Sequence, residues 1–253
     1  MEDLRIPSLP FSWRPQNKML ICSIATGAKH IALLRVMAPT VAFYALQHKM
    51  DSLVLPLESR LAPSRPPAWD KIVLIYNALR MYETVMWIDA DAIICDPGKD
   101  IREALDPDRT IHLVAHKRSR GRLIPNTGVW VCRRADSTLE LLEKVWEHAA
   151  YIHHRWWEQA ALMDLIGYDP QTYTFQGPTP YSGLVQFLDH EWNSRNKDSA
   201  PHPIIYHYCN KHKPVEDMEE HYSRFLNRIA GIEPPVAKPL EAGSDPSCSL
   251  TLS

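Results

Sequence analysis

The chain has 253 residues, 45% of them hydrophobic, and a formal net charge of −2 at neutral pH. This length and apolar content suit one large α/β domain, and the small net charge excludes binding to polyanions through overall charge. The five cysteines are odd in number and form no Cys-x-x-Cys pair, so they indicate neither a disulfide framework nor a zinc ribbon. Because the first residues lack the features of a signal peptide and no apolar run reaches membrane-spanning length, we expect a cytoplasmic protein.

The first third of the chain alternates predicted strands and helices. Residues 19–25 are an apolar run that ends at Thr26-Gly27, which is typical of a buried parallel strand and its turn. A helix is predicted over residues 30–49, with Pro39 as a kink or break, and a strand over residues 53–57. A proline-rich loop at 58–67 leads to a helix with apolar residues at helical spacing from Ile72 to Tyr82. A strand over residues 85–88 follows.

The remaining elements repeat this alternation. Strands are predicted over 111–115, 129–132 and 203–208, and helices over 156–166 and 215–229. Ser137 and Glu140 have the spacing of a capping box that opens another helix, and Gly167 is typical of a helix stop. We expect an N-terminal extension over 1–18, one domain over 19–231, and a disordered tail over 232–253, where prolines and small polar residues dominate.

Alternating strands and helices predict a single Rossmann-like α/β domain whose mostly parallel sheet is flanked by helices. In such folds ligands bind beyond the carboxyl ends of the strands. Neither G-x-G-x-x-G nor the P-loop pattern occurs, which argues against a dinucleotide fingerprint and a nucleoside triphosphatase.

The run Trp87-Ile88-Asp89-Ala90-Asp91-Ala92 places two aspartates at the end of a predicted strand. Two carboxylates two residues apart are costly in a buried strand unless they are paired or bound to a cation. Oxygen ligands of this kind suit Mg²⁺ or Mn²⁺, which also bind diphosphates. Alone, the motif is equally compatible with a strand end that has one capping and one solvated aspartate.

Four further stretches accompany this motif in a fixed order. They are Trp69-Asp70-Lys71, Pro125-Asn126-Thr127-Gly128, Trp156-Trp157-Glu158-Gln159 and His207-Tyr208-Cys209-Asn210-Lys211-His212-Lys213-Pro214. Over residues 19–214 this ordered set resembles the GT-A-type glycosyltransferases. It is most similar to the metal-dependent retaining α-galactosyl-, α-mannosyl- and α-xylosyltransferases, and more distantly to glycogenin-like and lipooligosaccharide galactosyltransferases.

The resemblance implies a nucleotide-sugar donor, a glycan or small-molecule acceptor, and Mn²⁺ or Mg²⁺ as cofactor. Asp89, Asp91 and His207 match the metal ligands of that family, and Asp89 also matches the residue that meets the donor ribose. On the donor, Lys213 matches the lysine that binds the diphosphate. UDP is the carrier that the family favours.

Other residues are assigned to the donor sugar and its surroundings. Asn126 and Glu158 resemble the residues that hold hydroxyls of the transferred sugar, and Gln159 matches the residue beneath the anomeric carbon. We also place Thr26 and Lys71 at the donor, since Thr26 ends the first strand and Lys71 lies one helix before the aspartates. The chain departs from the family pattern at Asn210, where glycine is usual, and at Ala160, where an acid is usual.

Catalytic roles are therefore expected for Gln159, Glu158 and Asp91. Because an unaided amide is a poor nucleophile, we expect substitution on one face of the sugar, with the leaving phosphate accepting the proton of the acceptor hydroxyl. A sugar nucleotidylyltransferase and a non-catalytic nucleotide-sugar or carbohydrate-binding protein are the alternatives. Against the first, no glycine-rich, arginine-containing loop follows the first strand.

The segment 116–122 places four Lys and Arg residues within seven positions. It is either a solvated loop or a contact for an anionic acceptor or lid. A nucleic-acid partner is not expected at this net charge without interleaved aromatic residues.

Overall fold

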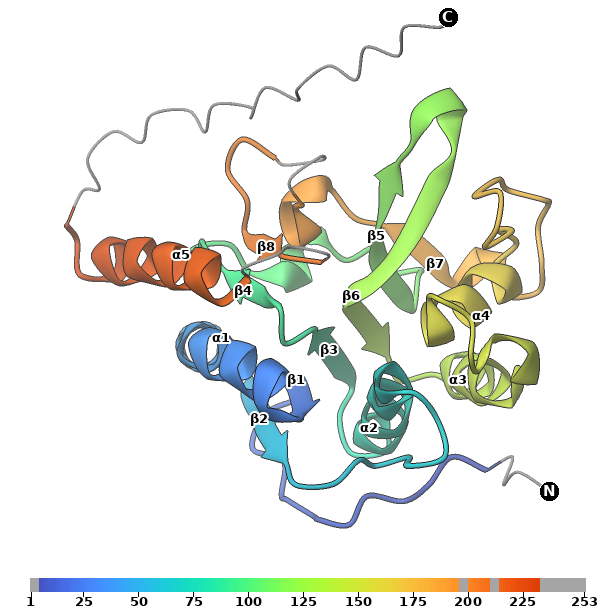
Figure 1. Cartoon of the computed structure of the whole chain (residues 1–253), viewed down its shortest axis with the longest axis horizontal. Coiled ribbons are helices and arrows are strands. Elements are labelled where there is room, and N and C mark those ends of the chain that lie inside the picture. Colours follow the sequence, from blue (N-terminus) through green and yellow to red (C-terminus); the bar gives the residue numbers. More distant parts are fainter. Residues whose placement is uncertain (1–4, 196–199, 210–213, 233–253) are drawn as a thin grey trace, which may run out of the picture.

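The computed structural model describes residues 5–195, 200–209 and 214–232. Its centre is a six-stranded sheet in the order β2-β1-β3-β6-β5-β7 (Figure 1). The strands are β1 (Met19–Thr26), β2 (Asp51–Leu57), β3 (Thr84–Ile88), β5 (Ile111–Lys117), β6 (Leu123–Arg133) and β7 (Val185–Phe187). Only β6 runs against its neighbours, because its pairings with β3 and β5 are antiparallel and the other pairings in this sheet are parallel. The predicted mostly parallel α/β sheet is confirmed.

Helices cover both faces of this sheet (Figure 1). One face packs against α1 (Ala28–Gln47), α5 (Pro214–Ile229) and a small antiparallel sheet of β4 (Ala92–Ile94) and β8 (Ile205–His207). The other face packs against α2 (Asp70–Leu79), α3 (Asp136–Glu147) and α4 (Trp157–Leu165). In β1, Met19 and Ile21 face the first core, while Leu20 and Cys22 face the second. This alternation is the two-residue period of a strand buried on both sides.

Short 3₁₀ segments complete the described elements. They are η1 (Pro67–Trp69), η2 (Ile101–Ala104), η3 (Ser119–Gly121), η4 (Ala149–Tyr151), η5 (Ser182–Leu184) and η6 (His190–Asn193). Before β1, Trp13 Nε1 donates to the hydroxyl of Tyr82 at 2.8 Å, so the segment preceding the first strand packs on the domain. None of the described helices combines the length and the apolar character that crossing a bilayer requires.

Two local predictions need correction and a third is confirmed. Helix α1 continues through Pro39, which does not break it. Helix α3 begins at Asp136 after an N-cap at Ala135 without a side-chain cap, so the capping box at Ser137 is wrong. The Glu140 carboxylate instead accepts a hydrogen bond from the Tyr181 hydroxyl at 2.9 Å. Gly167, with φ +92°, ends α4 as predicted, and a Cβ there would lie 2.2 Å from the carbonyl oxygen of Gly177.

Strand β6 is longer than predicted and is irregular where the candidate site lies. Leu113 of β5 pairs with Trp130, but the next residue, Val114, pairs with Asn126. Residues 127–129 therefore bulge out of the β5–β6 ladder. Such bulges re-aim side chains beside functional sites. Here the bulge places residues 126–128 within the strand, next to the end of β3, and not in a turn.

Candidate functional site

Asp91 and His207 are far apart in the sequence, and the small β4–β8 sheet brings them together. Ala92 of β4 pairs with His207 of β8, and the Tyr208 amide donates to the Asp91 carbonyl at 2.8 Å. His207 Nε2 consequently lies 3.2 Å from Asp91 Oδ1 and 3.8 Å from Asp89 Oδ2. One ligand atom from each of these three residues falls within 4.8 Å of the others, an arrangement that could hold a metal ion.

Electrostatics in this cluster couple the histidine to the aspartates. Burial opposes protonation of His207, but the adjacent Asp91 carboxylate raises the pKa of the imidazole above its ordinary value. Burial likewise opposes ionisation of Asp91, yet the charge and hydrogen bond of His207 hold the Asp91 pKa below its usual value. A cation at this site would displace the proton that lies between His207 and Asp91, because metal ligands bind in their deprotonated forms.

A chain of amide side chains fixes the orientation of the His207 ring. The backbone amide of Gly128 donates to Asn126 Oδ1 at 3.0 Å, which identifies that atom as the oxygen. Asn193 Nδ2 donates to the same oxygen at 2.8 Å. Asn193 must then present its own oxygen to His207, whose Nδ1 lies 3.0 Å away and donates to it. The ring therefore carries a proton on Nδ1 and turns Nε2 toward the aspartates, as in many metal-binding histidines.

Gly128 provides the space that this ring occupies. A Cβ at position 128 would lie 2.1 Å from Cε1 and 2.5 Å from Nδ1 of His207. No side chain larger than hydrogen fits there without displacing the ring. The Asn-x-Gly pattern thus serves two purposes, because the asparagine orients the amide chain and the glycine admits the histidine.

Gln159 is held by the same strand. Its Oε1 accepts from Asn126 Nδ2 at 3.0 Å and from the Thr127 backbone amide at 3.3 Å. The backbone donor identifies the oxygen, so Nε2 is the group turned away from β6. Among the described residues, none accepts a hydrogen bond from Gln159 Nε2, which leaves its two N–H donors available.

A buried ion pair lies beneath Asp89. Lys71 Nζ contacts Asp89 Oδ1 at 2.9 Å and Glu158 Oε1 at 3.0 Å, and the two partners from α2 and α4 are only 3% and 2% exposed. Burial opposes the charge on Lys71, but the two carboxylates raise its pKa above the ordinary value. Burial also raises the pKa of Glu158, against the effect of Lys71. Within the described residues, Glu158 Oε2 is buried and receives no hydrogen bond.

Asp89 is held from two sides. Its Oδ1 accepts from Lys71 and, at 2.6 Å, from Trp87 Nε1, while its backbone amide donates to the Gly128 carbonyl at 2.7 Å. This leaves Oδ2 on the side of His207. The carboxylate is therefore fixed before any ligand binds.

The structure brings most of the predicted site residues into one cluster, and their contact with a donor stays a prediction. Those that meet are Lys71, Asp89, Asp91, Asn126, Glu158, Gln159 and His207. Thr26 is the last residue of β1 and lies at the same edge of the sheet. Within the described part of the chain it makes no hydrogen bond or ion pair to that cluster. Lys213 lies outside the described residues. Sequence reasoning missed Asn193, which belongs to no motif recognised in the sequence.

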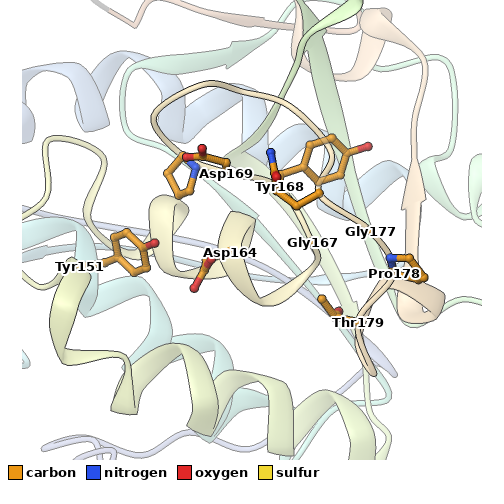
Figure 2. Close-up of a pocket in the computed structure, with 10 residues that line it drawn as sticks. Tyr151, Asp164, Gly167, Tyr168, Asp169, Gly177, Pro178 and Thr179 are labelled. Atoms are coloured by element: carbon orange, nitrogen blue, oxygen red, sulfur yellow. The ribbon is translucent and has the colours of Figure 1, made fainter.

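A separate pocket of about 520 Å³ lies at the end of α4, lined by residues that include Tyr151, Asp164, Tyr168 and Asp169 (Figure 2). It shares no residue with the cluster above. Its carboxylates already have partners, because Asp164 contacts His148 Nε2 at 2.7 Å and Asp169 accepts from the hydroxyl of Thr172 at 2.8 Å.

The arrangement of strands and helices is the GT-A fold of solved glycosyltransferases. No protein-family model and no curated protein sequence matches the chain. Similar solved structures do exist. One is a glycosyltransferase involved in glycosylation of the major capsid of PBCV-1, with a TM-score of 0.58, 19% identity, and coverage of 80% of this chain and 100% of that one.

Two further structures share the same architecture. The apo-form glycosyltransferase GlyE of Streptococcus pneumoniae TIGR4 aligns with a TM-score of 0.55 and 14% identity over 85% of this chain and 64% of its own. An active-site mutant of LgtC aligns with a TM-score of 0.51 and 14% identity over 81% and 95%. At these identities the likeness establishes the GT-A fold, which the sequence predicted.

Proposed function

We propose that the chain is a glycosyltransferase that moves a sugar from a nucleotide-sugar donor, UDP-linked, to a hydroxyl of a glycan or small-molecule acceptor. The transfer retains the anomeric configuration and depends on Mn²⁺ or Mg²⁺. The observation that carries this proposal is the cluster of Asp89, Asp91 and His207 at the carboxyl edge of a GT-A sheet.

The residues of the cluster fit a divalent cation. Two carboxylates and one imidazole whose Nδ1 proton is already bound by Asn193 form a mixed oxygen and nitrogen ligand set. Asp89 Oδ2, Asp91 Oδ1 and His207 Nε2 would hold the ion. When bound, it supplies positive charge for the diphosphate oxygens as the leaving group becomes an anion.

Gln159 supports retention without a covalent intermediate. Its oxygen is occupied by Asn126 and Thr127, so only N–H donors face a substrate, and these cannot attack the anomeric carbon. The bond from the anomeric carbon to the phosphate oxygen breaks, and the bond to the acceptor oxygen forms on the same face. The acceptor proton passes to the departing phosphate oxygen.

Glu158 supports a role in holding the donor sugar. Its Oε2 is a buried carboxylate oxygen without a partner in the described residues, and such an atom needs a donor. We assign a sugar hydroxyl to this oxygen, which donor binding must first uncover, with Lys71 balancing the charge through Oε1. Asn126 has a different role in this scheme. Its oxygen already accepts two hydrogen bonds, so it positions Gln159 and Asn193.

Thermal unfolding in the presence of UDP tests the metal and nucleotide part of the proposal. A ligand that binds only the folded state raises the melting temperature. We expect UDP with Mn²⁺ to stabilise the parent, and Asp91→Asn and His207→Ala to abolish this shift while remaining folded. Asp108→Asn, at an exposed carboxylate distant from the cluster, is the matched control. If both site variants respond like the parent, the metal assignment is wrong.

Product analysis tests the reaction itself. Incubation with UDP-glucose or UDP-galactose should release UDP with Mn²⁺ but not with EDTA. The anomeric coupling constant of the product, measured by NMR, should be that of an α linkage. A β-linked product rejects retention, and pyrophosphate-dependent formation of a nucleotide sugar identifies a nucleotidylyltransferase instead.

A further inference from the structure

Two neighbouring segments of the chain carry positive charge and no acid. Residues 111–133 form β5, the hairpin tip and β6, and residues 148–157 precede α4. Neither segment contains an Asp or Glu, although the whole chain has 30 of them. Around the hairpin tip and the start of α4 they contribute Lys117, Arg118, Arg120, Arg122 and Arg155. Arg133, at the other end of β6, donates to the carbonyls of Asp106 and Pro107. Since the net charge of the chain is −2, this region is locally cationic against a slightly acidic background.

The arginines lie against aromatic rings. Trp156 and Tyr173 stack with their ring centroids 4.9 Å apart and their planes at 24°. Arg155 Cζ lies 4.8 Å from the Trp156 centroid and 5.8 Å from that of Tyr173. Arg118 Cζ, from the hairpin tip, lies 5.8 Å from the same Tyr173 ring. We call Arg118, Arg155, Trp156 and Tyr173 the arginine–aromatic rim.

The rim adjoins the residues assigned to the donor sugar. The Trp156 carbonyl accepts from the backbone amide of Gln159 at 3.0 Å. The Tyr173 carbonyl accepts from the amide of Leu123 at 3.1 Å, where β6 begins. Leu123 precedes Asn126 by three residues, which is about 10 Å along a strand. An acceptor longer than one sugar ring can therefore reach from Gln159 to the rim. In Figure 1 the β5–β6 hairpin projects beyond the body of the sheet, and residues 117–121 at its tip are exposed.

The backbone is strained around this surface. Among the described residues other than glycine, positive φ occurs at Lys49, Arg120, Trp157 and Tyr173, and the last three belong to this region. Trp157, with φ 45°, directly precedes Glu158 and exposes 39% of its surface. Strained backbone and exposed large aromatics concentrate at binding surfaces, where the surrounding structure maintains them.

We propose that the arginine–aromatic rim binds an acceptor that carries negative charge, namely a glycan with a phosphate or a carboxylate group. This inference rests on the proposed glycosyltransferase function. The planar guanidinium groups of Arg118 and Arg155 match the geometry of phosphate and carboxylate oxygens. Flat aromatic faces suit the apolar faces of sugar rings. The position beside Gln159 favours a glycan over a membrane surface, because the charged group then lies one or more sugar rings from the reacting hydroxyl.

The test compares matched glycans and matched variants of the full chain. The protein, with UDP and Mn²⁺ present, is applied to a glycan array that displays neutral, carboxylated and phosphorylated forms of the same backbones. Glucose, glucuronic acid and glucose 6-phosphate are titrated in solution by tryptophan fluorescence. The test variant is Arg118→Glu with Arg155→Glu. The control is Arg35→Glu, at an exposed arginine of α1 on the opposite face of the sheet.

We expect the parent and the control to prefer charged glycans. The double variant should bind them about tenfold more weakly, since two exposed charge pairs are lost. Raising the salt concentration should weaken parental binding, because exposed charges are screened. The phosphate and carboxylate arms identify which charged group is recognised. Stabilisation by UDP with Mn²⁺ should be equal in parent, control and double variant.

Several outcomes overturn the proposal. Equal binding of neutral and charged glycans removes the role of charge, and absence of binding to every charged glycan removes the site. Binding to vesicles of phosphatidylserine without any glycan preference assigns the rim to a membrane. These results test the rim separately from the proposed function. If UDP and Mn²⁺ fail to stabilise the parent, that result contradicts the proposed transferase function and not the rim.

Discussion

Asn193 Oδ1 lies 3.0 Å from His207 Nδ1 and thereby decides which ring nitrogen faces Asp91. Loss of such a contact to a metal-binding histidine typically weakens metal affinity 10- to 100-fold. We expect Asn193→Ala to weaken Mn²⁺ binding by at least about tenfold. Free Mn²⁺ can be counted by electron paramagnetic resonance, and the ¹⁴N coupling of the bound ion reports directly on the imidazole.

Asn193→Asp separates the two contacts of this side chain. A carboxylate still accepts from His207 Nδ1, but it cannot donate to Asn126 Oδ1. The ¹⁴N coupling should therefore survive in Asn193→Asp and disappear in Asn193→Ala. An unchanged coupling in the alanine variant would show that other contacts orient the ring.

Gly128→Ala should damage the same centre by steric means. Its Cβ would lie 2.1 Å from His207 Cε1, so the ring or the strand must shift. Overpacking of this kind usually lowers the free energy of unfolding by about 1–3 kcal/mol. Urea unfolding measures that loss, and Mn²⁺ binding should weaken in parallel. Gly98→Ala is a suitable control, because a Cβ there meets only the Asp96 side chain at 3.2 Å.

Removal of the Lys71 charge should destabilise the fold strongly. Lys71→Met leaves the Glu158 carboxylate buried without a counterion, and breaking a buried pair typically costs about 3–5 kcal/mol. Lys71→Met combined with Glu158→Gln should recover part of this loss, since the second change removes the uncompensated charge. A loss below about 1 kcal/mol in the single variant would indicate that Glu158 becomes protonated at little cost.

The buried His116 side chain should make the free energy of unfolding depend on pH. Burial, assisted by the charge of Arg195, lowers the pKa of this buried imidazole to about 2. The unfolded chain binds a proton at this residue near pH 6.5, whereas the folded chain does not until about pH 2. The contribution of neutral His116 to the free energy of unfolding is therefore fully present above pH 6.5 and is lost as the pH falls.

The magnitude follows from proton linkage. Between pH 7 and pH 5 the free energy of unfolding should fall by about 2 kcal/mol because of this one proton. His116→Phe keeps a ring against His190, whose centroid is 5.6 Å away, and removes the titration. Urea unfolding at several pH values, with EDTA present, should give a shallower acid decline for the variant. Identical slopes in variant and parent contradict the assignment.

Local patterns predicted the sheet because those patterns are short-range, whereas the candidate site residues came mainly from the resemblance, and their roles stay predictions. Apolar runs defined β1 and β3, and the spacing of Asp89 and Asp91 indicated one shared ion. The bulge in β6 was not predictable, since it depends on the pairing register between β5 and β6. Lys71 and Glu158 were assigned to the donor separately. Their pairing requires α2 and α4 to pack against the same sheet face, which no sequence window contains.

The pairing of Ala92 with His207 has a consequence for biosynthesis. A ribosome releases Asp89 and Asp91 long before it releases His207, so the nascent chain at first holds two of the three candidate metal ligands. The missing imidazole arrives only when β8 docks on β4. A cation bound at the proposed site would therefore stabilise the folded chain through the pairing of β4 with β8, because all three candidate ligands are together only after that pairing.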